Sequence, residues 1–393
     1  MTSNARIAGV GMIPFTKPGA SESYDVMGAI AARLALADAG IAYSDLQQAY
    51  VGYVYGDSTC GQAALYPIGL SGIPVVNVNN ACATGSTALF LARQAVESGV
   101  VDCALALGFE QMNPGALVPQ YRDRMSPLNR LHQVVLRAQT WEKETPGAAQ
   151  YFGGAGREYS ERYGTKRETF AKISEKARRH AANNPFAIFR DPLTVEEILA
   201  SKPIYGPLTR YQCCPPTCGA AAAVVVSPTY ADKHGINGVE IAAQAMITDT
   251  DRTFESGSMI DAVGYNMTRS AADAVYELSG IGPEDLDVVE LHDCFTVNEL
   301  LSYEALRLTP EGTAERFIWD ADNTYGGQVV TNPSGGLLSK GHPLGATGLA
   351  QCTELVWQMR GVADKRQVEG ARIALQHNLG LGGACVVTMY RCA

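Results

Sequence analysis

Cys82 lies between a predicted strand and a predicted helix, in the stretch NNACATGSTALFLARQAV. A thiolate at the start of a helix lies near unpaired backbone N–H groups and the positive end of the helix dipole, and both lower the pKa of a cysteine. The small neighbours Ala81, Ala83 and Gly85 would let a substrate approach closely. The position therefore predicts a nucleophile, and the alternative is a small buried packing thiol.

A glycine-rich segment, NPSGGLLSKGHPLGATGLAQ, contains a histidine that could serve as the base for such a nucleophile. His342 is fixed between Gly341 and Pro343. No lysine follows the glycines in the arrangement of a phosphate-binding loop, so that function is excluded. The alternative is a turn that merely contains a histidine.

Two further segments place titratable side chains at the ends of predicted strands. In VVELHDCFTVNELL, His292 and Cys294 are separated by one residue and therefore share an orientation if the strand continues. In IALQHNLGLGGACVV, His377 closes another strand. The glycines after His377 do not open a helix, so a dinucleotide-binding fingerprint is not expected.

Histidines and cysteines at strand ends are also the residue types of a zinc site. The sequence has no H-x₃-H or C-x₂-C spacing among them. The local cluster CCPPTCG, with Cys213, Cys214 and Cys218, has no matching second pair. We therefore expect no metal.

Short β-rich runs alternate with segments of helical apolar periodicity, which predicts parallel strands joined by crossover helices. The predicted strands are 7–10, 49–53, 75–78, 104–107, 239–244, 288–291, 373–376 and 385–390, and the predicted helices are 25–39, 84–98, 269–278 and 348–359.

The chain contains an internal echo. GIAYSDLQQAYVGY from Gly40 and GIGPEDLDVVELHD from Gly280 share Gly, Ile, Asp and Leu, and each copy follows a predicted helix and enters a predicted strand. A second echo repeats Ala-Thr-Gly at residues 83–85 and 346–348, again at the start of a helix. Two diverged βα halves are therefore predicted.

Between the halves the sequence changes character. NPGALVPQYRDRMSPLNR and KARRHAANNPFAIFRDP are rich in Pro, Asn and Arg and lack strand alternation, which predicts an inserted loop domain with some helices. We expect an N-terminal half formed by residues 1–114 and 211–235, a loop domain at 115–210 and a C-terminal half at 236–393.

Composition limits the possible classes of protein. Of 393 residues, 46% are hydrophobic and 18% charged, as in a well-packed globular protein, and the net charge of −9 argues against nucleic-acid binding. No apolar run is long enough for a membrane span. The start MTSNARIAGVGMIPF is not a signal peptide, and the end YRCA is not a peroxisomal address. Ten dispersed cysteines predict reduced thiols and a cytoplasmic location.

Together the four motifs resemble those of the thiolase superfamily, and more narrowly the sterol carrier protein-x type, also called lipid-transfer-protein thiolases. Common thiolases have N-E-A-F, G-H-P and C-x-G blocks. This chain has H-D-C-F at 292–295, G-H-P at 341–343 and H-N-L-G-L-G-G at 377–383. The resemblance covers the whole chain. It implies an α/β thiolase fold, in which duplicated βαβαβαββ halves form a five-layered α/β/α/β/α body with an inserted loop domain. It also implies a homodimer or homotetramer.

The resemblance assigns roles to individual residues. Cys82 would be the acyl-accepting nucleophile, and His342 would take its proton and later help to hold the thioester oxygen. His377 occupies the position of the C-x-G cysteine, and Cys294 would take over proton transfer.

Two oxyanion holes are implied in the same way. His292, at the position of the family asparagine, would contribute to the first. Backbone N–H groups of Cys82 and of the glycine loop near Gly380 would form the second.

The implied reaction is cleavage of a 3-oxoacyl-CoA by CoA, through a Cys82 acyl-enzyme, to acyl-CoA and acetyl-CoA or propionyl-CoA in fatty-acid or sterol side-chain metabolism. CoA would be a substrate, and no tightly bound cofactor is expected. Loop-domain cations would meet its phosphates, and the sequence does not choose among Arg122, Arg124, Arg130, Lys172 and Arg179.

Two alternatives remain. One is a thiolase-fold aldolase that splits a steroid side-chain 3-hydroxyacyl-CoA with a small OB-fold partner, although such relatives tend to lack the nucleophilic cysteine. The other is a non-catalytic acyl-CoA or lipid carrier, which would not need the whole Cys/His set. The chain ends at the last thiolase strand, so no appended sterol-carrier domain is expected.

Overall fold

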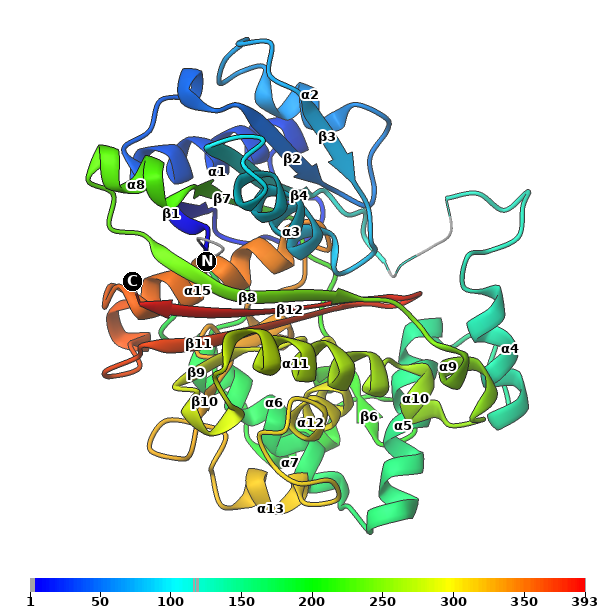
Figure 1. The fold of residues 1–393 in the computed structure, drawn as a ribbon. Helices are drawn as coiled ribbons and strands as arrows, with labels where there is room; N and C mark the ends of the chain where they lie inside the picture. Colours follow the sequence, from blue (N-terminus) through cyan, green and yellow to red (C-terminus); the bar gives the residue numbers. More distant parts are fainter. Residues whose placement is uncertain (1–3, 116, 118–119, 393) are drawn as a thin grey trace.

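The computed structural model describes residues 4–115, 117 and 120–392. Within them, one mixed sheet has the strand order β10-β9-β11-β12-β8-β1-β7-β4-β2-β3, and β5 and β6 pair separately (Figure 1). The strands are β1 (Arg6–Met12), β2 (Gln48–Gly52), β3 (Val75–Val78), β4 (Cys103–Glu110), β5 (Pro203–Tyr205), β6 (Leu208–Thr209), β7 (Gly219–Val226), β8 (Val239–Ile247), β9 (Val288–Glu290), β10 (Val330–Thr331), β11 (Ile373–Gly380) and β12 (Ala384–Cys392).

The helices cover both faces of this sheet. They are α1 (Tyr24–Ala39), α2 (Cys60–Leu65), α3 (Thr84–Glu97), α4 (Asn129–Ala138), α5 (Gly147–Tyr163), α6 (Arg167–Ala181), α7 (Val195–Ala200), α8 (Pro228–His234), α9 (Asp251–Glu255), α10 (Met259–Ala262), α11 (Tyr265–Ser279), α12 (Thr296–Ala305), α13 (Ala314–Trp319), α14 (Gly336–Ser339) and α15 (Thr347–Met359). No helix of the described residues is long and apolar enough to cross a membrane.

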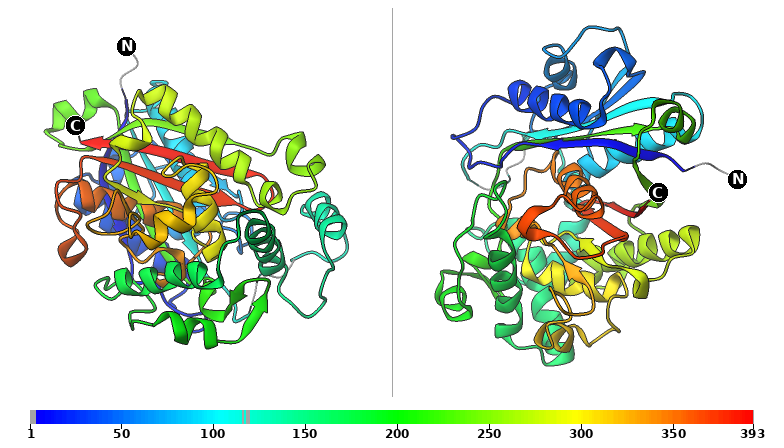
Figure 2. Two further views of the ribbon diagram at one scale, coloured as in Figure 1. Left: turned by 90° about the horizontal axis from the view of Figure 1, so that it is seen from below. Right: turned by 90° about the vertical axis from the view of Figure 1, so that its left-hand side faces the viewer.

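The sheet folds into two halves that meet at β1 and β8, which pair through Arg6 with Glu240 and Ile7 with Val239. Helices α3 and α15 pack against each other between the halves (Figures 1 and 2). Helix α1 covers the outer face of the N-terminal half, and α11 covers that of the C-terminal half. This is the expected α/β/α/β/α layering.

Every predicted strand and helix is present, with ends that differ by a few residues. The expectation of a parallel sheet is wrong for five of the nine strand pairs in the large sheet. β2 is parallel to β3 and β4, and β9 to β10 and β11, but β7, β8 and β12 pair antiparallel. β12 follows β11 after a short turn, which can join only antiparallel strands. β7, the run GAAAAVVV, was not predicted because alanine has little strand preference.

The internal echo has a structural basis. Gly40 and Gly280 end α1 and α11 with φ of 65° and 67°, a left-handed conformation that favours glycine. A short 3₁₀ turn follows each helix, at Tyr43–Asp45 and Pro283–Asp285. In each turn the aspartate accepts a hydrogen bond from the backbone N–H three residues earlier, at 3.2 Å and 3.0 Å respectively. The repeated Gly and Asp therefore specify the same helix-to-strand connection twice.

Helices α4 to α7 and the β5–β6 pair lie in the region between 115 and 210 and pack on the C-terminal half. Lys176 of α6 is buried there and forms an ion pair with Glu299 of α12. Its ammonium group also donates to the carbonyl of Thr331 at 3.3 Å. Because breaking a buried ion pair leaves an uncompensated charge, this pair fixes α6 on the C-terminal half.

The first turns of α3 and α15 meet through glycines. A Cβ atom on Gly85 would lie 2.7 Å from the Gly345 carbonyl oxygen and 3.1 Å from the Gly348 nitrogen, and one on Gly348 would lie 2.6 Å from Asn378 Oδ1. Both Ala-Thr-Gly copies therefore supply the glycine at this contact, which explains the second echo.

Gly85→Ala should lower the free energy of unfolding by about 1–3 kcal/mol, since the new methyl group would overpack rigid backbone. Gly147→Ala is the matched control: it also lies in the first turn of a helix, but its methyl group would meet only the edge of the Trp141 ring. Urea unfolding followed by circular dichroism measures both. Equal stability of the two variants would contradict the close approach of α3 and α15.

Candidate active site

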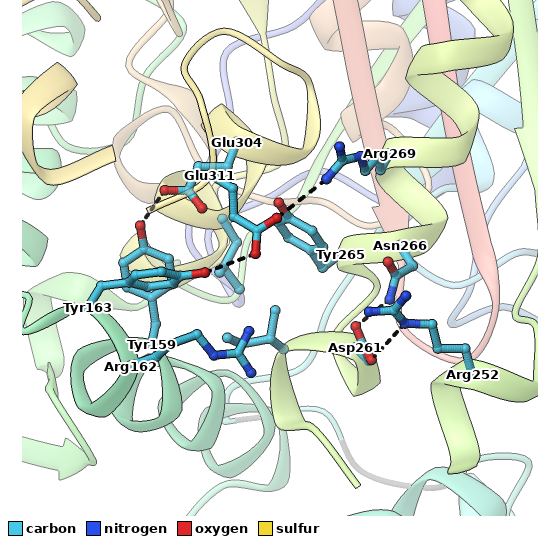
Figure 3. Close-up of a pocket in the computed structure, with 12 residues that line it drawn as sticks. Tyr159, Arg162, Tyr163, Arg252, Asp261, Tyr265, Asn266, Arg269, Glu304 and Glu311 are labelled. Carbon is cyan, nitrogen blue, oxygen red and sulfur yellow. Dashed lines mark hydrogen bonds and ion pairs between the residues drawn. The ribbon is translucent and has the colours of Figure 1, made fainter. Parts of the chain in front are cut away.

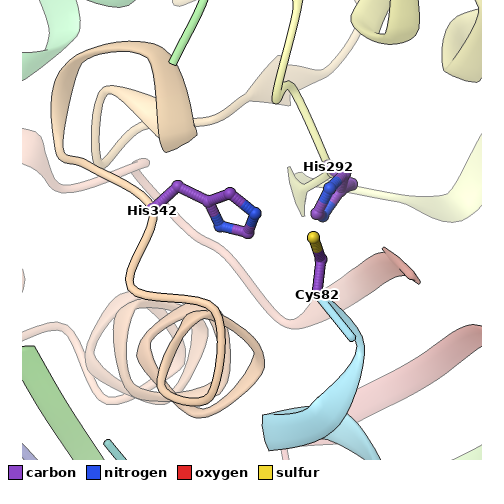
Figure 4. Close-up of side chains that lie close together, drawn as sticks. All are labelled: Cys82, His292 and His342. Atoms are coloured by element: carbon purple, nitrogen blue, oxygen red, sulfur yellow. The ribbon is translucent and has the colours of Figure 1, made fainter. Parts of the chain in front are cut away.

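Three predicted site residues converge on one point. The thiol of Cys82 and ring nitrogens of His292 and His342 lie within 4.8 Å of one another (Figure 4). Cys82 precedes α3, His292 follows β9, and His342 lies on the loop between α14 and α15. The first comes from the N-terminal half of the sheet and the other two from the C-terminal half.

The backbone turn that carries Cys82 is strained. Ala81 has φ of 48°, which is rare for a residue with a side chain and costs of order 1 kcal/mol or more. The Thr84 hydroxyl accepts from the Asn80 N–H at 2.8 Å and donates to the Ala81 carbonyl at 2.6 Å. These bonds maintain a sharp turn that exposes part of Cys82 to the site.

Burial raises the pKa of the Cys82 thiol to about 12, and the charge of Glu110 adds to this effect. Hydrogen bonds from the backbone N–H groups of Leu381 and of Cys82 itself oppose it only in part. The N–H groups lower the pKa as expected, but the expectation of a net lowered pKa is wrong, because desolvation of the thiolate exceeds their stabilisation. Cys82 is therefore a neutral thiol, and it would need a base in order to act as the expected nucleophile.

The N–H groups of Cys82 and Leu381 lie where the sequence predicts donors of the second oxyanion hole. Leu381 is the residue after Gly380, so its N–H and that of Cys82 flank the sulfur. Gly380 is needed for this approach, since a Cβ atom there would lie 3.1 Å from the nitrogen of Ala83.

His342 has the properties of that base. Its Nδ1 lies 2.7 Å from Thr347 Oγ1, and this hydroxyl donates to the Pro343 carbonyl at 3.0 Å. The hydroxyl proton is thereby used, so Nδ1 carries the ring proton and Nε2 has the lone pair. Nε2 is buried and has no hydrogen-bond partner among the described residues. Burial lowers the pKa of His342 to about 3, so the ring is neutral.

The His292 ring lies edge-on to that of His342, with centroids 5.1 Å apart. Its Nδ1 is 3.1 Å from Asn378 Nδ2, and its carbonyl accepts from the side-chain amide of Asn298. Burial, followed by the nearby His342 and His377, holds the pKa of His292 well below its ordinary value. This ring is neutral as well.

Cys294 is buried beside the cluster. Burial raises the pKa of its thiol well above the ordinary value, and the proximity of Cys214, Cys82 and Asp293 raises it further. The Cys214 N–H donates to the Cys294 carbonyl at 2.9 Å. Cys294 is therefore a neutral thiol near Cys82, and Cys214, which the sequence suggested only as part of a cysteine cluster, is a third thiol at the site.

His377 lies one layer away from the reacting groups. Its Nδ1 accepts from the backbone N–H of His292 at 3.4 Å, and its Nε2 lies 3.0 Å from Thr268 Oγ1. Burial lowers its pKa to about 3. Both ring nitrogens are engaged, so the geometry gives His377 a positioning contact with His292 and not a free proton-transfer group.

Comparison with known proteins identifies the family of this chain. The model "Thiolase, N-terminal domain" matches residues 5–198, and "Thiolase C-terminal domain-like" matches residues 250–389. The chain belongs to the thiolase family. It is 56% identical over 390 residues to "Sterol carrier protein 2" of Rattus norvegicus, covering 98% of this chain and 71% of the relative.

Two further relatives extend the comparison. "Benzoylsuccinyl-CoA thiolase subunit BbsB" of Thauera aromatica is 37% identical over 391 residues, covering 96% of this thiolase-family chain and 94% of the relative. The solved structure "Ltp2-ChsH2(DUF35) aldolase" superposes with a TM-score of 0.83 at 24% identity, covering 99% of this chain and 98% of that one. The latter likeness concerns the fold.

Buried carboxylates that the sequence did not reveal hold the loops of this thiolase-family site. Glu110 accepts from the N–H groups of Val54, Tyr55 and Gly345 at 3.1, 2.9 and 3.0 Å. Burial raises its pKa to about 7, and the same hydrogen bonds oppose that rise. Glu110 thereby connects β4 to the loop that carries His342.

Two more acidic groups connect β9 and the segment after it to α14 and to Lys340, which precede His342. Asp293 accepts from the N–H groups of Leu337 and Leu338 at 2.7 and 3.3 Å. Glu290 forms a buried ion pair with Lys340 at 3.4 Å. No short motif announces these contacts, because each partner is more than forty residues away in sequence.

A separate cavity of about 240 Å³ lies between α5, α10, α11 and α12 (Figure 3). None of the predicted site residues lines it. Its arginines have acidic partners: Arg252 lies 3.2 Å from Asp261 and Arg269 lies 3.6 Å from Glu311, while Arg162 pairs with a glutamate on its own helix at 2.8 Å. The cavity is therefore charge-balanced and is not an evident site for CoA phosphates.

Alkylation of Cys82 should increase with pH without levelling off near neutrality. Because its pKa is about 12, the thiolate fraction rises about tenfold for each pH unit between 7 and 10. Iodoacetamide labelling of the free protein, quantified by peptide mass spectrometry with Cys82→Ala as the reference, measures the rate. A plateau around pH 7 would indicate a preformed thiolate–imidazolium pair instead.

Proposed function

We propose that this protein is a thiolase that cleaves 3-oxoacyl-CoA with CoA, giving acyl-CoA and acetyl-CoA or propionyl-CoA. The observation that carries the proposal is the Cys82 thiol within 4.8 Å of His342, whose buried Nε2 has a lone pair with no hydrogen-bond partner in the described part of the chain. Thiol next to a free imidazole base is the arrangement of an activated cysteine nucleophile.

In the first half-reaction, Cys82 transfers its proton to His342 Nε2 as sulfur attacks the 3-oxo carbon of the substrate. The bond between C2 and C3 then breaks, which leaves an acyl group on Cys82 and an enolate of the departing CoA ester. Cys294 donates its proton to C2 of this enolate. The raised pKa of Cys294 suits the role, because a neutral thiol must be present before transfer.

In the second half-reaction, the Cys294 thiolate removes the proton from the thiol of free CoA. The CoA sulfur attacks the acyl carbon, the acyl–Cys82 bond breaks, and the Cys82 thiolate recovers its proton from His342. Both catalytic groups return to their starting protonation states. The scheme therefore requires CoA as a substrate and no tightly bound cofactor.

Negative charge develops on different substrate oxygens in these steps, and two sets of donors are available. The oxygen on the carbon bonded to Cys82 would lie beside the N–H groups of Cys82 and Leu381, which already face the sulfur. The thioester oxygen of the departing enolate would be held by His292 and, once protonated, His342.

The names of the relatives support this class of substrate, since one is called a benzoylsuccinyl-CoA thiolase and another a sterol carrier protein. We infer a role in fatty-acid or sterol side-chain metabolism.

The ten cysteines, all described, are free thiols, which supports a reducing compartment such as the cytoplasm. The aldolase alternative, with an OB-fold partner, rests on a likeness of fold.

We also infer a homodimer, or a homotetramer built from it. Strand β3 is at the end of the sheet and pairs only with β2 among the described residues. Val76 on this strand is 43% exposed. An exposed apolar edge strand can pair with the same strand of a second copy around a twofold axis.

Cys82→Ala should reduce thiolysis by roughly 10³-fold or more, because the variant lacks the thiol that takes the acyl group in the proposed reaction. Cys103→Ala, a buried cysteine of β4 outside the site, is the matched control and should retain activity. The assay incubates the protein with 3-oxoacyl-CoA esters of different chain type and follows CoA-dependent cleavage. Mass spectrometry of the reaction without CoA should find the acyl group on Cys82.

Retained thiolysis in Cys82→Ala would refute the proposal. Cleavage of 3-hydroxyacyl-CoA alone, dependent on an added OB-fold partner protein, would favour the aldolase. Binding of acyl-CoA with no cleavage in the unmodified protein would indicate a carrier.

Val76→Asp should convert the dimer to a monomer, because a charge on the edge strand opposes pairing with a second strand. Leu278→Asp is the control, since Leu278 is also exposed (68%) but lies on α11 of the other half. Sedimentation equilibrium gives the mass of each variant. An unmodified protein that sediments at the mass of one chain would contradict the inferred dimer.

A further inference from the structure

Asn378 joins the backbone of the nucleophile to the His292 ring, and the direction of its side-chain amide can be deduced. Its Nδ2 lies 3.0 Å from the Cys82 carbonyl oxygen and 3.1 Å from His292 Nδ1. A carbonyl oxygen can only accept, so the NH₂ group, with its two protons, must face these two atoms.

A chain of hydrogen bonds confirms this direction from the other end. The amide of Gln376 donates to Ser86 Oγ at 2.8 Å, so the Ser86 hydroxyl is free to donate onward to Asn378 Oδ1, also at 2.8 Å. Gln376 is itself oriented by the Tyr390 hydroxyl, which donates to Oε1. Every group in the chain is buried, so solvent does not compete.

The amide determines the tautomer of His292. Because Nδ1 accepts a hydrogen bond from the Asn378 amide, it has the ring's lone pair, and the proton of the neutral ring must be on Nε2. His342 has the opposite tautomer, with the proton on Nδ1 and the lone pair on Nε2. The two imidazoles beside Cys82 are therefore a donor and an acceptor, and they are not interchangeable.

The side-chain amide of Asn378 also determines whether His292 can bind a metal ion. One thiol and two imidazoles within 4.8 Å are a ligand set typical of zinc. A histidine that binds zinc donates its other ring N–H to a carboxylate, carbonyl or water. His292 faces an amide donor instead, so Nδ1 is occupied and Nε2 is protonated, and neither nitrogen offers a lone pair.

We propose that Asn378 is a positioning residue that holds His292 in its Nε2–H form and thereby keeps the Cys82–His292–His342 cluster from binding zinc. The catalytic consequence rests on the proposed thiolase reaction, in which His292 must donate to the developing oxyanion. The tautomer and the exclusion of metal do not depend on that reaction.

Asn378→Asp tests the proposal because the carboxylate has nearly the same shape but accepts where the amide donates. At pH 8, chosen to keep the new carboxylate ionised, the His292 proton should move to Nδ1. Affinity for Zn²⁺, measured by equilibrium dialysis against zinc chloride, should rise at least about tenfold. The kcat for thiolysis should fall on the order of 10²-fold with little change in KM, as when an oxyanion donor is removed.

The tautomer is read directly from the ¹⁵N chemical shifts of labelled histidine. The chain has only six histidines, and the signal that disappears in His292→Gln belongs to His292. Asn298→Asp is the matched control. It also places a carboxylate against His292, but at the backbone carbonyl, so neither the ring tautomer nor zinc affinity should change. If Asn378→Asp does not fold, Asn378→Ala, which removes the donor, should still show a mixture of tautomers.

An unmodified protein with the His292 proton on Nδ1, or zinc affinity that is equal in the unmodified protein and both Asn378 variants, would overturn the proposal. Loss of thiolysis in Cys82→Ala would leave it standing, and retained thiolysis there would refute the proposed function without affecting the tautomer. The two proposals therefore fail through different measurements.

Discussion

The contact between the first turns of α3 and α15 is the constraint on which the site depends. Gly85 and Gly348 allow two helix termini, one from each half, to meet without intervening side chains. The Cys82 turn precedes one terminus and the His342 loop precedes the other, so the contact brings both to the same depth. A methyl group on either glycine would move Cys82 away from His342, and proton transfer between two groups tolerates little change in their separation.

Because the two halves pack closely, polar groups around the site lose contact with water, and each needs a hydrogen-bond partner in the protein. Around the site, Glu110 and Asp293 accept hydrogen bonds from five backbone N–H groups, which lose contact with water as the halves pack. Burying a carboxylate is unfavourable unless such donors surround it. Here they also fix loop positions, because each carboxylate connects segments that are distant in sequence. The Glu290–Lys340 pair does the same for the segments that lead into His292 and His342.

The sequence predicted what depends on local chemistry. Gly40 and Gly280 were visible as an echo because each copy needs a left-handed residue at the end of a helix, and the histidines and cysteines stood out by type and by family resemblance. Other features depend on contacts across the fold. The raised pKa of Cys82 results from burial by both halves, and the antiparallel pairing of β7 depends on where the chain returns after residue 210. Cys214 and Asn378 could not be selected from the sequence, because their importance comes from contacts with Cys294 and His292.

Burial also determines how the chemistry can begin. A thiolate–imidazolium pair in this site would have to be maintained against desolvation on both partners, since burial raises the pKa of Cys82 and lowers that of His342. The Cys82 thiol and the His292 and His342 rings are therefore neutral in the free protein. In the proposed reaction, charge would separate only when a substrate carbon is in place to accept the sulfur. With both rings neutral, the tautomer of each histidine determines whether it can donate or accept a proton at Nε2. The surrounding hydrogen bonds determine that tautomer. For His342 that bond is made by Thr347, and for His292 by Asn378, so two identical side chains have opposite tautomers, one with a lone pair on Nε2 and the other with a proton there.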